Sequence, residues 1–277
     1  MTNAAPGAAG TEDFSMTQRD ILDTALQQSA IDLSCAVGDL TSGVNTVVRS
    51  GCSPDARRYL ALPFLCNFVT YGSGVVASVS EDYADIACAY MARVPAQHLF
   101  ETPSMHLLDD AVRPLGGRVC FMAEYFLPAL DALRPLPCPY EMRLMTQSDF
   151  ADLYTPAWSN ALCEMRRELD VLGVGAFDTE GRLIGLAGCS ADCDSMWQIG
   201  IDVLPEHRRE GIASALTSRL ALEILERGRV PFYCAAWCNI PSVRSAVRAG
   251  FRPAWAEMTV KDSAFVDKIN GMNGAAL

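Results

Sequence analysis

A strand followed by an unusually open helix start is the feature of this sequence best suited to chemistry. Apolar side chains alternate over residues 199–203 and stop before Pro205, and from Ile212 onwards they recur every four residues. Gly211 and the small residues after it leave room beside the first backbone N–H groups of this helix, which have no partner within it. Because the N-terminal end of a helix dipole favours an anion, the segment predicts a site for a phosphate-bearing ligand.

The spacing of these residues resembles the acyl-CoA signature of the GCN5-related N-acetyltransferase (GNAT) superfamily. In that signature a Gln or Arg, two residues, a Gly, one residue, and a Gly or Ala follow a strand. The matching residues here are Arg208, Gly211 and Ala213. On its own so short a pattern is weak, because small residues at a helix start often serve only close packing.

A second match strengthens the resemblance. The family has an Asn after its fifth strand and Gly-Phe eleven and twelve residues later, and Asn239, Gly250 and Phe251 reproduce that spacing. The resemblance covers roughly residues 140–262. It implies an α/β fold in the C-terminal half, with a mixed, splayed central sheet flanked by helices.

The resemblance also implies acetyl-CoA as co-substrate, lying between two central strands that separate. The end of the strand at Val203 would face the pantetheine arm, and the N–H groups of residues 209–214 would hold the pyrophosphate. Asn239 would line the other side of the thioester, or would only cap a turn or helix. The implied cofactor-binding residues are Val203, Leu204, Arg208, Arg209, Gly211, Ile212, Ala213, Ser214, Asn239 and Ser242.

The implied reaction is direct attack of an amine on the acetyl thioester, which requires a neutral amine and a proton source for the departing thiolate. The family usually supplies that proton from a Tyr seven residues after the Asn, where this chain has Ala246. Two positions that often carry a general-base Glu hold Trp197 and Cys234. We interpret Cys234 as a core residue rather than a nucleophile, because no His neighbours it in sequence.

Two residues are candidates for the missing groups. Ser245 stands beside the vacant Tyr position, although a helix serine is more often solvated or bonded within its helix. Glu164 would share a helix face with Glu168. The resemblance implies that this helix borders the acceptor groove, so either carboxylate could recognise or deprotonate an amine. The alternative, which we favour, is a solvated surface pair beside neighbouring arginines.

Composition limits the partners. The formal net charge of −11 disfavours nucleic acid and anionic membranes and favours cationic amines. No stretch is apolar enough for a membrane span, and the first ten residues do not read as a secretion signal. We expect a cytoplasmic protein. A homodimer is left open.

The eleven cysteines favour reduced thiols. Their number is odd, and no Cys-x-x-Cys is present. The pairs Cys189/Cys193 and Cys234/Cys238 have a spacing that a zinc site could use, but free Cys is among the most buried residue types, so we interpret them as core residues. We therefore expect no metal.

A Pro-rich segment at 134–139 divides the chain. We predict a loose tail over 1–13, an N-terminal α/β or α+β accessory domain over 14–135, and a GNAT domain over 136–277. The accessory domain is either a packing domain, which we favour, or a degenerate copy of the same fold. Helices are predicted over 17–37, 83–94, 104–115 and 156–169, with Ser148 opening a short one. Strands are predicted over 64–80 (interrupted at 71–74), 118–127, 140–145, 171–177, 183–189, 230–237 and 257–260.

The function predicted from these features is acetyl-CoA-dependent N-acetylation of a small-molecule or peptide amine. The alternative is a CoA-binding sensor or interaction protein that has lost catalysis, which the residues at 197, 234 and 246 favour.

Overall fold

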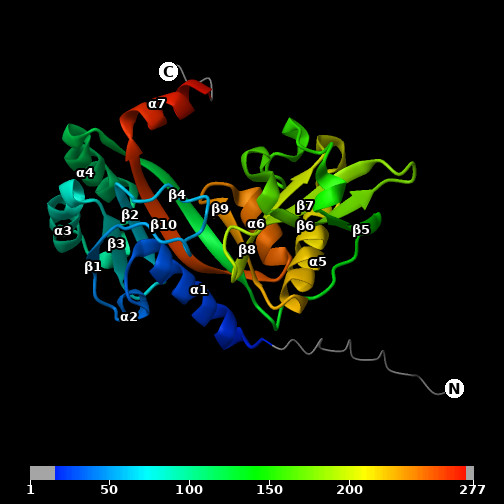
Figure 1. Cartoon of the computed structure of the whole chain (residues 1–277), viewed down its shortest axis with the longest axis horizontal. Helices are drawn as coiled ribbons and strands as arrows, with labels where there is room; N and C mark the ends of the chain where they lie inside the picture. The colour runs from blue at the N-terminus through cyan, green and yellow to red at the C-terminus, as the bar shows by residue number, and fades with distance from the viewer. Residues whose placement is uncertain (1–15, 273–277) are drawn as a thin grey trace.

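Ten strands form one continuous sheet that runs through both halves of the part of the chain described, residues 16–272 of a computed structural model (Figure 1). Their order is β1-β3-β2-β10-β4-β9-β8-β7-β6-β5. The tail predicted over 1–13 lies outside the described residues. The strands are β1 (Thr46–Arg49), β2 (Cys66–Thr70), β3 (Val75–Val79), β4 (Gly117–Pro128), β5 (Glu141–Thr146), β6 (Asp170–Phe177), β7 (Leu183–Ser190), β8 (Met196–Val203), β9 (Val230–Ala236) and β10 (Phe251–Asp262).

Seven α-helices accompany the sheet within the same residues. They are α1 (Gln18–Leu33), α2 (Val37–Thr41), α3 (Ala84–Arg93), α4 (Thr102–Val112), α5 (Ile212–Glu226), α6 (Ile240–Arg248) and α7 (Ser263–Met272). Figure 1 shows α3 and α4 at one end of the molecule and β5, β6 and β7 at the other, with the long strands β4 and β10 between them. The mixed α/β class predicted from the sequence is confirmed.

Strand β4 links the two halves. It precedes the Pro-rich segment in the chain, yet it pairs antiparallel with both β9 and β10. β10 in turn pairs with β2, so the sheet passes without interruption from the N-terminal strands to the C-terminal ones. The sequence predicted β4 as a strand but gave no sign of this position.

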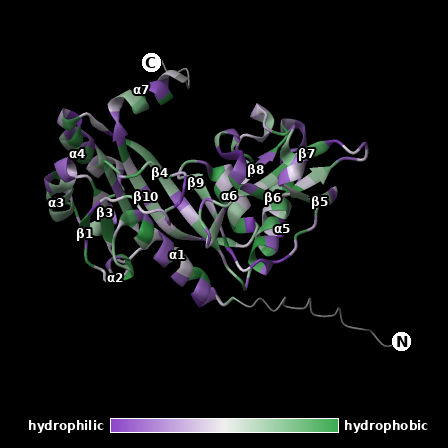
Figure 2. Ribbon diagram, in the orientation of Figure 1, coloured by the Kyte–Doolittle hydropathy of each residue, from purple (hydrophilic) through white to green (hydrophobic). Residues whose placement is uncertain are grey.

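Helix α5 covers one face of the C-terminal part of the sheet. Its residues from Ile212 to Leu225 are almost all buried, and in Figure 2 much of it carries the hydrophobic colour. A side chain at Gly185 of β7 would meet Ile212 and Leu216, which shows that α5 packs directly on the strands. Burial of this apolar surface holds the start of α5 fixed against the end of β8.

The α-helix predicted over residues 156–169 is wrong. Two short 3-10 turns, Pro156–Trp158 and Glu164–Leu169, stand in its place, with a non-helical backbone at Arg166. A third turn, Gln147–Phe150, is capped by Thr146 and not by Ser148.

Tertiary contacts explain the missing helix. The carboxylate of Asp202 accepts hydrogen bonds from the backbone N–H groups of Asn160 and Ala161, at 2.8 and 2.9 Å. The segment also lies so close to the sheet that a Cβ on Gly200 would be 1.8 Å from the Asn160 carbonyl oxygen. Backbone groups that an α-helix would have used internally are therefore bound to the sheet.

Candidate active site

The loop between β8 and α5 presents a run of unpartnered backbone N–H groups. Within the described residues, the N–H groups of 209–214 donate to no backbone or side-chain acceptor. Arg209 and Gly211 both adopt left-handed backbone angles, with φ of 71° and 86°. This conformation is unfavourable for an arginine, costing about 1–2 kcal/mol, and it turns the loop onto the helix start. The arrangement is a run of backbone donors at a helix start, which suits an anion.

Side-chain hydrogen bonds hold the β8–α5 loop in place. Arg208 donates from Nε to the Val203 carbonyl oxygen at 3.1 Å, which ties the loop back to the end of β8. Glu210 accepts a 2.6 Å hydrogen bond from the Tyr140 hydroxyl, and this bond raises the pKa of Tyr140. The acidic side chain is thereby held by a partner outside the loop.

Arg248 is a basic residue that the sequence pattern did not reveal. It is exposed at the end of α6, and its Nη2 lies 3.8 Å from the position a Cβ on Gly211 would occupy. A guanidinium here adds positive charge directly beside the unpartnered N–H groups. Only the fold brings it there, because 37 positions separate it from Gly211 in the chain.

Strands β8 and β9 separate beyond the middle of the sheet. They are parallel and in register from Met196 opposite Val230 to Ile199 opposite Tyr233, and no pairing continues beyond that point in the described structure. Neighbouring parallel strands that stop pairing leave backbone groups on both sides without ladder partners. The end of β8, residues 200–203, stays paired with β7 but not with β9, and it leads directly into the loop of N–H groups.

Hydroxyl side chains mark the same region on α5 and α6. Ser214 Oγ lies 3.4 Å from Ser245 Oγ, so the first turn of α5 touches α6. Ser242 Oγ lies 2.8 Å from the Tyr233 hydroxyl. Asn239 caps α6 by accepting a hydrogen bond from the Ser242 N–H at 3.3 Å, which realises the capping role considered from the sequence.

Ile212 contributes differently from the other predicted cofactor residues. Its side chain is 1% exposed and belongs to the core, so only its backbone N–H remains for a ligand. Ala213 is partly exposed, and Ser214 is buried.

Glu164 lies on the segment that covers the other face of the sheet. Gly185 faces α5, whereas Gly188, three residues later, faces Ala161, because side chains alternate along a strand. The carboxylate of Glu164 is 68% exposed and pairs with Arg167 at 2.6 Å. The helix face that Glu164 was expected to share with Glu168 is absent, since no α-helix forms here.

Cys234 also faces away from α5. Its sulfur accepts a 3.0 Å hydrogen bond from Gln198 Nε2, and burial raises the pKa of its thiol to about 11. A thiol with so high a pKa holds almost no thiolate at neutral pH, which agrees with a core role. Trp197, at the other position considered for a base, is half-buried.

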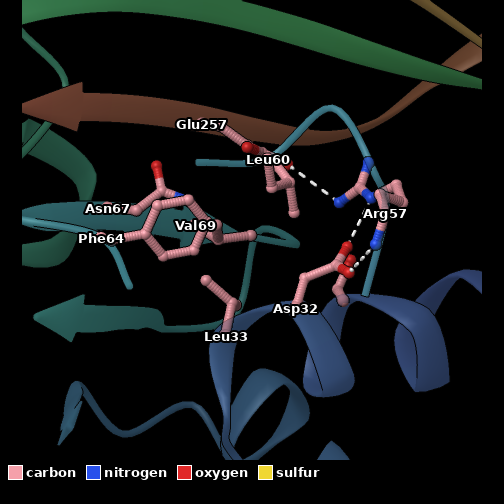
Figure 3. A pocket seen from close by; sticks show the side chains of 9 residues that line it. Asp32, Leu33, Arg57, Leu60, Phe64, Asn67, Val69 and Glu257 are labelled. Carbon is pink, nitrogen blue, oxygen red and sulfur yellow. Dashed lines mark hydrogen bonds and ion pairs between the residues drawn. The ribbon is translucent and has the colours of Figure 1, made fainter. Parts of the chain in front are cut away.

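A closed polar cluster joins the two halves of the chain on this second face (Figure 3). The buried Arg57 guanidinium pairs with Asp32 of α1 and lies 3.5 Å from Glu257 of β10. Glu257 also accepts a 2.8 Å hydrogen bond from Trp255, and Arg57 donates to the Tyr59 hydroxyl at 2.9 Å. The space beside these groups has no room for a water molecule. We therefore interpret this Arg57 cluster as structural.

Metal-binding geometry is not found in residues 16–272, where no three His, Cys, Asp or Glu side chains gather suitably. All eleven cysteines are free thiols. Among the helices of the described region, none is long and apolar enough to cross a bilayer.

A family model described as GNAT acetyltransferase matches residues 125–255, from the last third of β4 into β10. The match includes the β8–α5 loop, the separating strands and α6. This segment is a GNAT acetyltransferase domain. Its family membership agrees with the resemblance drawn from Arg208, Gly211, Ala213 and Asn239.

Similar solved structures carry the same family name. A GCN5-related N-acetyltransferase-like protein from Streptococcus suis 89/1591 is 20% identical, over 57% of this chain and 69% of its own, with a TM-score of 0.44. A putative GNAT acetyltransferase from Novosphingobium aromaticivorans DSM 12444 is 19% identical, over 52% and 66%, with a TM-score of 0.40. The aligned part thus spans only about two thirds of those chains. No curated protein matches this sequence.

Proposed function

We propose that this protein is an acetyl-CoA-dependent N-acetyltransferase acting on a small-molecule or peptide amine. The observation that carries the proposal is the run of unpartnered N–H groups at 209–214, inside a segment that belongs to the GNAT acetyltransferases. A diphosphate is the ligand best matched to such a run at a helix start, because it accepts several hydrogen bonds and carries negative charge.

Arg209, Arg248 and the N–H groups would hold the pyrophosphate of CoA. The pantetheine arm would then follow the β8 edge that β9 leaves unpaired, where Val203 and Leu204 lie, towards the point at which β9 diverges at Tyr233. Asn239 and Ser242, at the start of α6, would border the arm on its other side. Bound this way, the thioester lies where the two strands part.

The amine would reach the thioester from the sheet face opposite α5. It attacks the carbonyl carbon as the neutral amine, the carbon–sulfur bond breaks, and the thiolate departs with the bonding electrons. The exposed Glu164 is the carboxylate we predict nearest that approach, with ordered water as the alternative proton acceptor. The expected compartment is the cytoplasm.

Calorimetric titration with acetyl-CoA, followed by a thiol-release assay over a panel of amines, tests this function. We expect saturable binding and release of free CoA with at least one amine. Absence of binding at millimolar acetyl-CoA would remove the proposal.

The second candidate is a CoA-binding sensor or interaction protein without catalysis. Cys234 and Ala246 favour it, because the first holds a protonated thiol and the second carries no proton-transferring group. Tight CoA binding without turnover on any amine would support it, and measurable turnover would exclude it.

A further inference from the structure

Tyr233 and Ser242 form a hydroxyl pair at the point where β8 and β9 separate. Tyr233 is the last β9 residue in register with β8, and its hydroxyl reaches Ser242 Oγ on α6 at 2.8 Å. Tyr233 is 2% exposed, whereas Ser242 is only partly buried. One hydroxyl of the pair therefore lies in the interior, and the other lies on α6 where solvent or a ligand can reach it.

The pair has unused hydrogen-bonding capacity. Burial raises the pKa of Tyr233, so this phenol stays protonated at neutral pH. A hydroxyl group has one hydrogen to donate and two lone pairs. If Tyr233 donates to Ser242, the Ser242 hydrogen remains free, and within residues 16–272 its Oγ has no other hydrogen-bond partner.

Position on α6 adds a second argument. Ser242 and Ala246 are four residues apart and so lie on the same helix face, one turn from each other. Ser245 instead directs its hydroxyl to Ser214 on α5. Cys234 bonds to Gln198 on the opposite face of the sheet.

We propose that Ser242, oriented by Tyr233, donates a hydrogen bond to the sulfur of CoA as the thiolate departs. This inference rests on the proposed function. The amine nitrogen forms a bond to the acetyl carbon, the carbon–sulfur bond breaks, and its electron pair stays on sulfur. The nitrogen then loses one proton to solvent and the sulfur gains one, giving an amide and free CoA. Ser242 acts on the reacting sulfur, and Tyr233 is a positioning residue.

An equilibrium experiment tests the pair without any knowledge of the acceptor. Free CoA is bound to the full-length protein, and its thiol is titrated by the ultraviolet absorbance of the thiolate. A free thiol has a pKa of about 8.5, and a donor aimed at sulfur lowers that value. We expect bound CoA to titrate about one pH unit lower in the wild type, Ser242→Ala to abolish the shift, and Tyr233→Phe to reduce it by half or more.

Tyr90→Phe is the matched control. Its hydroxyl is also buried and hydrogen-bonded, to the Leu99 carbonyl oxygen at 2.6 Å, but in the N-terminal half. It should leave the shift unchanged. Because Ser242 is partly exposed, Ser242→Ala keeps the test available even if Tyr233→Phe folds poorly.

Kinetics with an accepted amine sharpen the result. Ser242→Ala should lower kcat about tenfold to hundredfold with little change in KM for acetyl-CoA. The double variant should lose no more than Ser242→Ala alone, since the two hydroxyls act as one unit. If the wild type does not bind CoA, the proposed function fails and this inference fails with it. If CoA binds but its thiol titrates equally in wild type and Ser242→Ala, only this inference is overturned.

Discussion

The Arg57 cluster and the β8–α5 loop place the same kinds of polar group in opposite settings. Arg57 is 3% exposed, and Asp32, Glu257 and Tyr59 all contact it. In the loop, Arg209 is exposed with a left-handed backbone, and the N–H groups that follow have no partner in the described chain. A polar group whose bonds are complete within the protein holds the fold together. A group held in a fixed place with its bonds incomplete is free to bind something else.

The largest effect should be the loss of stability caused by breaking the Arg57 cluster, whose polar groups are all partnered. Arg57→Met leaves two carboxylates buried without their cation, and the expected loss is about 3–5 kcal/mol of unfolding free energy. Urea unfolding of Arg57→Met beside Arg58→Met, its exposed neighbour, measures this. A loss below about 1 kcal/mol would mean that the cluster is not structural.

Beside the loop, removing a positive charge from α6 should weaken CoA binding without changing stability. Arg248→Met takes away the guanidinium beside Gly211 and should weaken CoA binding about tenfold, which is about 1.4 kcal/mol. Arg244→Met, one turn earlier on α6 and also exposed, is the control. Calorimetry at two salt concentrations checks both variants. Equal losses in the two would show only a general attraction of CoA to α6.

Asp170 is an intermediate case, buried with some hydrogen bonds made. Burial raises its pKa to about 6, against about 3.9 in an unfolded chain, although it accepts a bond from the Cys163 N–H. The folded state therefore binds the extra proton, and wild-type stability falls as pH rises from about 4 through 6. Asp170→Asn lacks this titration. Between pH 5 and pH 8 the wild type should lose about 1 kcal/mol relative to the variant, measured by urea unfolding. If the wild type instead gained stability relative to Asp170→Asn over this range, the raised pKa of Asp170 would be wrong.

The smallest effect concerns backbone strain at Arg209. Arg209→Gly should raise the unfolding free energy by about 0.5–1 kcal/mol, because glycine adopts a positive φ without penalty. Arg208→Gly, at an ordinary φ of −71°, should instead lower it. Thermal unfolding compares them, and stabilisation by both would point to some cause other than strain.

Local patterns predicted the elements that position the site. The four-residue spacing from Ile212 gave α5, alternation gave β8, and Asn239 gave the start of α6. They failed over residues 156–169, because the Asp202 carboxylate accepts hydrogen bonds from the N–H groups of Asn160 and Ala161, which lie 42 and 41 positions earlier in the chain. The place of β4 in the sheet, Arg248 beside Gly211 and the bond between Tyr233 and Ser242 also depend on tertiary contacts. A single sequence carries no local sign of such contacts.

The central claim is that the N–H groups at the start of α5 bind the diphosphate of CoA. Gly211→Asp would add a negative side chain there, and Gly181→Asp would place the same residue at a matching φ of 80° in the β6–β7 turn. Calorimetric titration with CoA should show affinity about a hundredfold weaker for Gly211→Asp and unchanged for Gly181→Asp. A folded Gly211→Asp protein that binds CoA as tightly as the wild type would contradict the account.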